Sequence, residues 1–172
     1  MMTSKTKALW DAMATASAAH NEHNDCTVKA LSAATGIDYA DCHKAMAKAG
    51  RKNRRGCHFH ITGRDAAETL GFKMETVPDS KYAAKTMITA ERDRALKSGR
   101  YVIRVRGHVA ALVDGKVVDW SQGRRHIIKA VYQFTPIAAA PAPAPKVASI
   151  PAGSAKWLAF TKYKKADNLE LF

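Results

Sequence analysis

The sequence predicts an α+β domain in which a helix-rich first half precedes an antiparallel sheet. Three observations lead to this fold class. Apolar residues recur at helical spacing over the first fifty positions, strand-like apolar runs follow from residue 72, and Asp114-Gly115 marks a two-residue hairpin turn. With 172 residues, the chain is long enough for one domain with its own core.

The first expected helix covers residues 4–19, where apolar side chains form one face and the polar run HNEHND ends the pattern. Glycines and capping residues bound the later helices. These are expected from Cys26 to a stop at Gly36, from a cap at Asp38 to Gly50, from a cap at Thr62 or Asp65 to Leu70, and from a cap at Thr89 to a stop at Gly99.

Strands are expected in FKMETV (72–77), RYVIRVRGHVAALV (100–113), KVVDW (116–120) and RRHIIKAVYQFTP (124–136). The Asp114-Gly115 turn fixes the register of the hairpin, because a two-residue turn pairs the residues on either side of it. Val113 then pairs with Lys116, and Ala111 pairs with Val118. In this register His108 lies diagonal to Asp119 on the same face, within reach of a hydrogen bond.

Residues 136–156 form a Pro/Ala-rich segment that predicts an extended, semi-rigid linker after a domain spanning 1–135. The remaining residues, 157–172, are too few for a core and are rich in aromatic side chains. A docking tail is therefore expected, which binds a virion protein, a host protein or the chain's own domain. Its candidate contact residues are Trp157, Phe160, Tyr163 and Phe172.

The chain is strongly basic, with 28 Lys and Arg against 15 Asp and Glu and a formal net charge of +13. Such an excess favours an anionic partner, although a solvated basic surface explains it equally well. A candidate nucleic-acid patch lies in the segment GRKNRRGCHFHITGR, where basic side chains surround Phe59. Its cations are Arg51, Lys52, Arg54, Arg55 and Arg64, and Arg100, Arg104 and Arg106 alternate on one strand face nearby.

The chain has three cysteines, Cys26, Cys42 and Cys57. This number is small and odd, so it does not indicate a disulfide framework. No apolar run is long enough to span a bilayer, and Asp11 interrupts any signal-peptide core. Unpaired thiols without an export signal predict a reducing compartment. A structural zinc site is not expected, because the CHFH sequence at residues 57–60 lacks a partner pair at zinc-finger spacing.

A thiol nucleophile requires a thiolate, a base and a group that orients the base. Cys26 is expected at a helix N-terminus, where free N–H groups and the helix dipole lower a thiol pKa. His108 interrupts an apolar strand next to Gly107, and Asp119 lies within reach on the following strand. Each residue alone would be read as structural, but the three together predict a catalytic site, with Trp120 placed to shield the His108–Asp119 contact.

The order of a helix-first Cys, a strand Gly-His and an Asp after a hairpin resembles that of papain-like cysteine peptidases. NDCTVKAL and GHVAALVDGKVVDW are most similar to small papain-like domains such as the bacteriocin-processing peptidases, of the kind found in tailed-phage genomes. They also resemble the ovarian-tumour type of deubiquitinase. The resemblance covers roughly residues 20–135 and implies a papain-like fold, with N-terminal helices packed on a C-terminal antiparallel sheet.

The resemblance implies that Cys26 is the nucleophile, His108 the general base and acid, and Asp119 the orienting carboxylate. It implies hydrolysis of a peptide or isopeptide bond in a protein or peptide substrate, without a cofactor. The family's oxyanion Gln is replaced by His20, so that Asn24 or Asn21 is expected to assist the Cys26 N–H. A phage origin would place the protein in the host cytoplasm or in the virion.

Two other functions stay open on the sequence. A non-enzymatic virion or assembly protein could keep a degenerate peptidase fold and dock through its C-terminal tail. A basic nucleic-acid-binding protein would instead use the arginine-rich segment, alone or together with catalysis.

Overall fold

A computed structural model describes residues 3–82 and 84–137. It shows the α+β architecture expected from the sequence, with helices in the first half and a five-stranded antiparallel sheet in the second. The strands are arranged in the order β1-β5-β2-β3-β4. All of the described residues belong to one compact unit.

The helical half comprises α1 (Ser4–Ala19), α2 (Cys26–Thr35), α3 (Tyr39–Lys48), the π-helix η1 (Phe59–Gly63) and α4 (Arg64–Thr69). The strands are β1 (Phe72–Val77), β2 (Arg100–Val105), β3 (His108–Val113), β4 (Lys116–Val118) and β5 (Ala130–Pro136). Short helices α5 (Asp79–Tyr82), α6 (Met87–Arg92) and η2 (Arg94–Leu96) connect β1 to β2.

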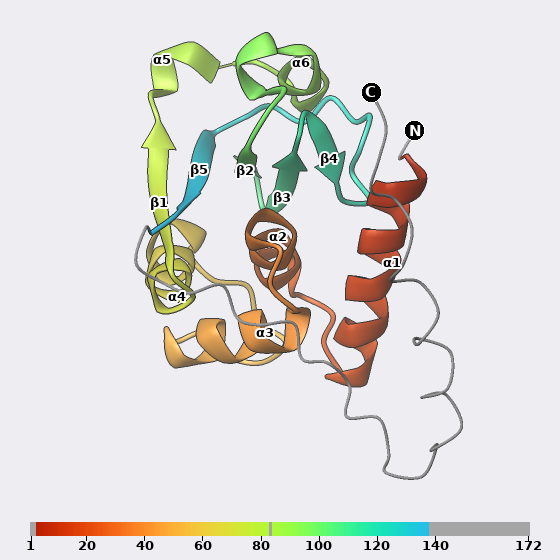
Figure 1. Ribbon diagram of the computed structural model, residues 1–172, viewed down its shortest axis with the longest axis vertical. Helices are drawn as coiled ribbons and strands as arrows, with labels where there is room; N and C mark the ends of the chain where they lie inside the picture. Colours follow the sequence, from red (N-terminus) through yellow and green to blue (C-terminus); the bar gives the residue numbers. More distant parts are fainter. Residues whose placement is uncertain (1–2, 83, 138–172) are drawn as a thin grey trace, which may run out of the picture. The chain divides into compact units, whose positions relative to one another are not determined.

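Helices cover both faces of the sheet, with α2, α3 and α4 on one side and α5 and α6 on the other (Figure 1). The alternation of side chains along β2 separates the two cores. Val102 packs with the helices of the first half, whereas Ile103 packs with the core beneath α6 and η2. The sheet is therefore buried on both faces, which explains why its strands read as continuous apolar runs.

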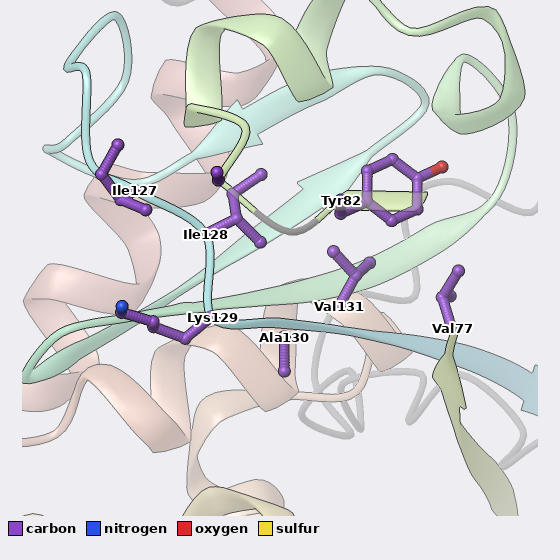
Figure 2. Close-up of a pocket in the computed structure, with 8 residues that line it drawn as sticks. Val77, Tyr82, Ile127, Ile128, Lys129, Ala130 and Val131 are labelled. Atoms are coloured by element: carbon purple, nitrogen blue, oxygen red, sulfur yellow. The ribbon is translucent and has the colours of Figure 1, made fainter. Parts of the chain in front are cut away.

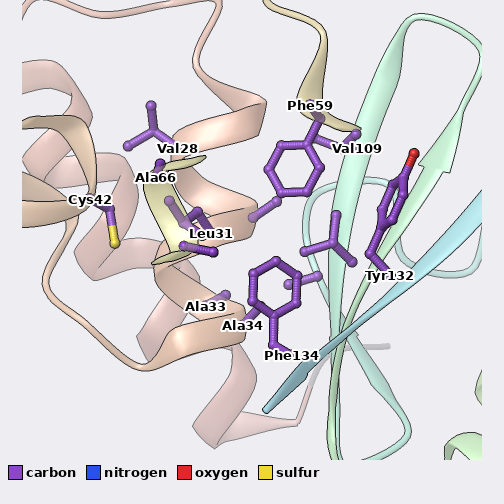
Figure 3. Packing of buried hydrophobic residues seen from close by; sticks show 14 of the residues in the cluster. Val28, Leu31, Ala33, Ala34, Cys42, Phe59, Ala66, Val109, Tyr132 and Phe134 are labelled. Atoms are coloured by element: carbon purple, nitrogen blue, oxygen red, sulfur yellow. The ribbon is translucent and has the colours of Figure 1, made fainter. Parts of the chain in front are cut away.

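Helix α2 is the most enclosed helix of the first half, and every residue except Cys26 and Lys29 is buried. Val28 and Leu31 belong to the same core cluster as Phe59 and Phe134, with Leu31 toward the two rings and Val28 on the side of the helix away from them (Figure 3). Burying one such aliphatic side chain contributes about 1.5–3 kcal/mol. This packing fixes the helix axis, and with it the position of Cys26 at the N-terminus.

The C-terminal end of α2 is also fixed. Gly36 takes the left-handed conformation, with φ of 75°, and its amide donates to the Ser32 carbonyl. The Arg100 guanidinium of β2 donates to the carbonyls of Ala33 and Ala34 at 3.3 and 3.4 Å. A cation at this end of a helix interacts favourably with the helix dipole.

The hairpin of β3 and β4 has the predicted register, with Val113 opposite Lys116 and Ala111 opposite Val118. The expected single strand over 100–113 is wrong, because Arg106 and Gly107 form a tight turn that separates β2 from β3. Val105 pairs with His108 across this turn, and Gly107 has φ of 71°. Apolar residues continue on both sides, so the periodicity of the sequence does not reveal the break.

Three other expected boundaries differ. The cap of α6 is Thr86 rather than Thr89, since the Thr86 hydroxyl accepts from the Thr89 amide, and the helix ends where Asp93 becomes extended. The last strand begins at Ala130 rather than at residue 124. The helix expected from a cap at Thr62 and Asp65 has Gly63 at its N-cap position without a side-chain cap, and it directly follows η1, in which the Phe59 ring leaves no room for a Cβ atom at Gly63.

Strand β5 extends through Pro136, the first residue of the predicted linker. The rest of that linker, and the predicted tail with Trp157, Phe160, Tyr163 and Phe172, lie outside the described residues. Within the described residues, no helix has the length and apolar character needed to cross a membrane.

Candidate active site

Cys26 is the first residue of α2, as the sequence predicts. Asp25 precedes the helix, and its backbone carbonyl accepts from the amides of Val28 and Lys29. As the first residue of the helix, Cys26 has a backbone N–H without an intrahelical acceptor, and its thiol experiences the positive end of the helix dipole. The side chain is only partly buried, so that a substrate can reach the sulfur.

His108 begins β3, directly after the Arg106–Gly107 turn, and Asp119 follows β4. The hairpin brings the two side chains together, and His108 Nε2 donates to Asp119 Oδ1 at 3.0 Å. Asp119 is 2% exposed, and its Oδ1 also accepts from the Ser121 amide at 2.8 Å. This bond holds the carboxylate in place, and the His108–Asp119 contact predicted from the hairpin register is present.

The Cys26 thiol lies beside the His108 imidazole and the Val109 backbone, and both favour the thiolate. Burial by itself would raise the pKa of Cys26, but these two neighbours outweigh it and lower that pKa below the ordinary value of 9.0. Burial would lower the pKa of His108, but hydrogen bonds to Asp119 and Cys26 raise it to about 9. Both shifts act in the direction of a thiolate–imidazolium pair.

The two ring nitrogens of His108 take different roles. Because Nε2 is committed to Asp119, Nδ1 is the nitrogen left for the Cys26 thiol. The Trp120 ring lies beside the imidazole with 5.3 Å between ring centroids, and Arg124 stacks on that indole at 4.9 Å. Trp120 is therefore placed to shield the His108–Asp119 hydrogen bond from water, as expected from the sequence.

Two pockets meet at the Cys26–His108 pair, and Cys26, His108, Gly56 and Gly107 line both of them. One, of about 470 Å³, extends along η1 and the end of β2. The other, of about 350 Å³, extends between Trp10 and Trp120. We call the first the η1 pocket and the second the tryptophan pocket. A chain bound across both would place one of its bonds at the Cys26 sulfur.

The two oxyanion candidates are placed differently. Asn24 lines the tryptophan pocket beside Cys26, and its Nδ2 donates to the Arg54 carbonyl at 3.2 Å, which leaves a second N–H on the same nitrogen. Asn21 lines neither pocket, so Asn24 is the better placed amide. His20 faces away into a cluster with Tyr39 and His43, and its Nδ1 contacts the Ala16 carbonyl.

A buried ion pair fixes the loop that carries Asn24. Glu22 is bound by Arg51 through two hydrogen bonds of 2.7 and 3.1 Å, and by the Arg54 amide at 2.9 Å. Arg51 also donates to the Asn24 carbonyl. Burial would raise the pKa of Glu22, but hydrogen bonds from Arg51, His43 and the Arg54 amide lower it to about 2. This pair ties the loop before Cys26 to the basic segment.

The predicted basic patch is only partly at the surface. Arg51 is 4% exposed and engaged with Glu22, so it is unavailable to a phosphate. Arg54 is exposed but donates through Nε to the Asn21 carbonyl. The exposed remainder of the patch is Lys52, Arg55 and Arg64. The three arginines of β2 and its turn do not form one basic surface. Arg100 binds α2, Arg104 lines the η1 pocket and Arg106 is exposed.

The other two thiols differ from Cys26. Cys42 is fully buried, and this burial raises the pKa of its thiol to about 12. Cys57 lines the η1 pocket, and burial also raises its pKa. Among the described residues, no group of three or more His, Cys, Asp or Glu side chains is arranged to hold a metal ion.

A further cavity, of about 270 Å³, lies on the opposite face of the sheet. It is lined mainly by apolar side chains, with Val77, Tyr82, Ile128 and Val131 facing one another (Figure 2). None of the three catalytic candidates borders it. It is a small, mainly apolar space that lies apart from the candidate catalytic residues.

Comparison of the chain with protein-family models, with curated proteins and with solved structures gave no match. The site is therefore interpreted from its own geometry.

Sequence reasoning missed Glu22 and Arg104 as neighbours of the site. The partner of Glu22 is 29 residues away in the chain, and no local pattern connects the two. An acidic residue in the polar run before Cys26 was the available signal. Arg104 was noticed only as one member of an alternating basic strand, which does not distinguish a pocket from a surface.

Proposed function

We propose that the protein is a papain-like cysteine hydrolase that cleaves a peptide or isopeptide bond. The observation that carries this proposal is the placement of Cys26 and His108 side by side in two pockets, with His108 hydrogen-bonded to the buried carboxylate of Asp119. Cys26 and His108 lie where the η1 pocket and the tryptophan pocket meet, and the pKa of the Cys26 thiol is lowered. These are the three parts that thiol catalysis needs, namely an activated nucleophile, a proton carrier and an orienting acid.

In the proposed mechanism the Cys26 thiolate attacks the carbonyl carbon of the scissile amide. The resulting oxyanion accepts hydrogen bonds from the Cys26 N–H and from the free N–H of Asn24. The His108 imidazolium gives its proton to the leaving amine, the C–N bond breaks and a thioester remains on Cys26. His108 then takes a proton from water, whose oxygen attacks the thioester, and the C–S bond breaks to release the acid. Asp119 stabilises the imidazolium throughout.

The proposed papain-like fold is supported by the order of the parts. A buried helix begins at the nucleophile, and an antiparallel hairpin supplies His108 and Asp119 in that order. The helix packs directly on the strand of His108, so the nucleophile and the base approach from two different elements of one core.

The proposal is tested with two peptide mixtures, a proteome-derived peptide library and a set of branched peptides joined through lysine ε-amines. Each is incubated with the wild-type protein and with Cys26→Ala, and new termini are identified by mass spectrometry. We expect new termini with the wild type and none with Cys26→Ala. If the wild type yields none in either mixture although Cys26 alkylates rapidly, the thiol is activated for another acyl transfer and the peptidase assignment is wrong.

A further inference from the structure

The η1 pocket contains an arginine, Arg104, whose guanidinium has no hydrogen-bond partner among the described residues. Arg104 is near the end of β2, where its cross-strand neighbours are Val109 of β3 and Ala130 of β5, neither of which has a polar side chain. Its side chain lines the η1 pocket. Among the described residues, none accepts a hydrogen bond from this guanidinium, and the buried Nε is unsatisfied. Leaving a buried donor unpaired is costly, more so on a charged group.

A second buried polar group of the same pocket, the Thr27 hydroxyl, also lacks a partner in the described part of the chain. Thr27 is 3% exposed and lines the η1 pocket, and its Oγ1 makes no hydrogen bond within the described part of the chain. It belongs to α2, whereas Arg104 belongs to the sheet. Two unsatisfied donors therefore face the pocket from different elements.

The other polar side chains that line the η1 pocket also favour an anionic ligand. Three histidines border the η1 pocket, namely His58, His60 and the catalytic candidate His108, and no Asp or Glu does. Apart from the Cys26 thiolate of the proposed mechanism, the lining therefore offers no anionic side chain to oppose the permanent positive charge of Arg104. Such a pocket suits an anion, and a carboxylate matches the planar fork of a guanidinium.

We propose that the η1 pocket is a specificity subsite in which Arg104 binds a carboxylate of the substrate beside the scissile bond. This inference rests on the proposed hydrolase function, since the same pocket borders Cys26. It assigns an acidic peptide as the substrate class, with Arg104 as the residue that determines specificity and Thr27 as a supporting donor. The carboxylate belongs either to an Asp or Glu side chain or to a peptide C-terminus.

Three isosteric alkylating probes test the assignment and distinguish these two sources. Iodoacetyl-glutamate α-amide carries a side-chain carboxylate, iodoacetyl-glutamine carries a terminal carboxylate, and iodoacetyl-glutaminamide is neutral. In each case the Cys26 sulfur displaces iodide, and the labelling rate is followed by mass spectrometry. We expect one of the two acids to label Cys26 about tenfold faster than the neutral probe, as expected for a charge-assisted hydrogen bond.

Arg104 variants show whether this preference comes from the pocket. Arg104→Gln should abolish the preference, so that the acidic and the neutral probe label Cys26 at one rate, and Arg104→Lys should keep part of it. Arg106→Gln is the matched control, because Arg106 is an exposed arginine two residues away that does not line the pocket, and it should keep the full preference. Circular dichroism confirms that each variant is folded.

The outcomes separate this inference from the proposed function. Rapid labelling of Cys26 by all three probes at one rate would overturn the carboxylate subsite and leave the hydrolase proposal standing. A preference that survives in Arg104→Gln would also overturn it, since the charge would then come from elsewhere. Labelling of Cys26 as slow as that of the buried Cys42 with every probe would overturn both.

Discussion

The structure predicts how much the ion pair between Glu22 and Arg51 contributes to the free energy of unfolding. The Glu22 side chain is fully enclosed, and Arg51 binds both of its carboxylate oxygens. The pKa of Glu22 falls from an ordinary 4.5 to about 2, which at ~1.4 kcal/mol per pKa unit corresponds to about 3 kcal/mol of folding free energy. We expect Glu22→Gln to lose about this amount at neutral pH, because Arg51 then keeps a buried charge without a partner.

The loss should depend on pH in a defined direction. A carboxylate whose pKa is lower in the folded protein contributes its full stability above the unfolded pKa and loses it as the pH falls through the folded value. The difference between wild type and Glu22→Gln should therefore be constant above pH 5, shrink below about pH 4.5 and vanish near about pH 2. Urea unfolding followed by tryptophan fluorescence at several pH values measures this difference.

Glu68→Gln is the matched control, because Glu68 is exposed on α4 and the same charge is removed. It should change the free energy of unfolding by no more than about 0.5 kcal/mol. The reasoning would be refuted if Glu22→Gln were as stable as Glu68→Gln at neutral pH. Since the pair also fixes the loop of Asn24, Glu22→Gln should slow alkylation of Cys26 less than it slows peptide cleavage.

Three further variants test separate contacts. Asp119→Asn should lower the pKa of His108 from about 9 toward 6.5, as measured by NMR titration of the imidazole, and an unchanged pKa would mean that Asp119 does not set it. Gly36→Ala should cost about 1 kcal/mol or more, because φ is 75° and the new Cβ would lie 3.1 Å from Arg100 Nη1, whereas Gly56→Ala should be neutral. Tyr39→Phe removes the 2.6 Å hydrogen bond to the buried Asp25 and should cost about 1–3 kcal/mol, and an unfolding free energy equal to that of the wild type would contradict this role.

Much of the candidate site could be predicted because its determinants are local. Gly36 and the polar run before Cys26 bound α2, so the position of the thiol at a helix start follows from a few neighbouring residues. The Asp114-Gly115 turn likewise fixes the hairpin register, which places His108 against Asp119. In both cases the periodicity of side chains and one turn signal were sufficient.

The features that the sequence did not predict depend on long-range packing. The turn at Arg106–Gly107 is hidden because the apolar strands on both sides are buried on both faces of the sheet. The basic segment was expected to face solvent throughout, but Arg51 is drawn into the protein by Glu22, 29 residues away in the chain. A sequence shows where the basic residues occur, but it does not show which of them binds a buried carboxylate in the folded protein.

The central claim is that Cys26 is an activated thiol paired with His108, and the pH dependence of its alkylation tests this most directly. Iodoacetamide labelling of each cysteine is followed by mass spectrometry across a pH series, in the wild type and in His108→Ala. We expect Cys26 to label at mildly acidic pH, well before Cys57 and Cys42, whose pKa values are raised, and to lose this advantage in His108→Ala. Equally slow labelling of all three cysteines in the wild type would contradict the claim.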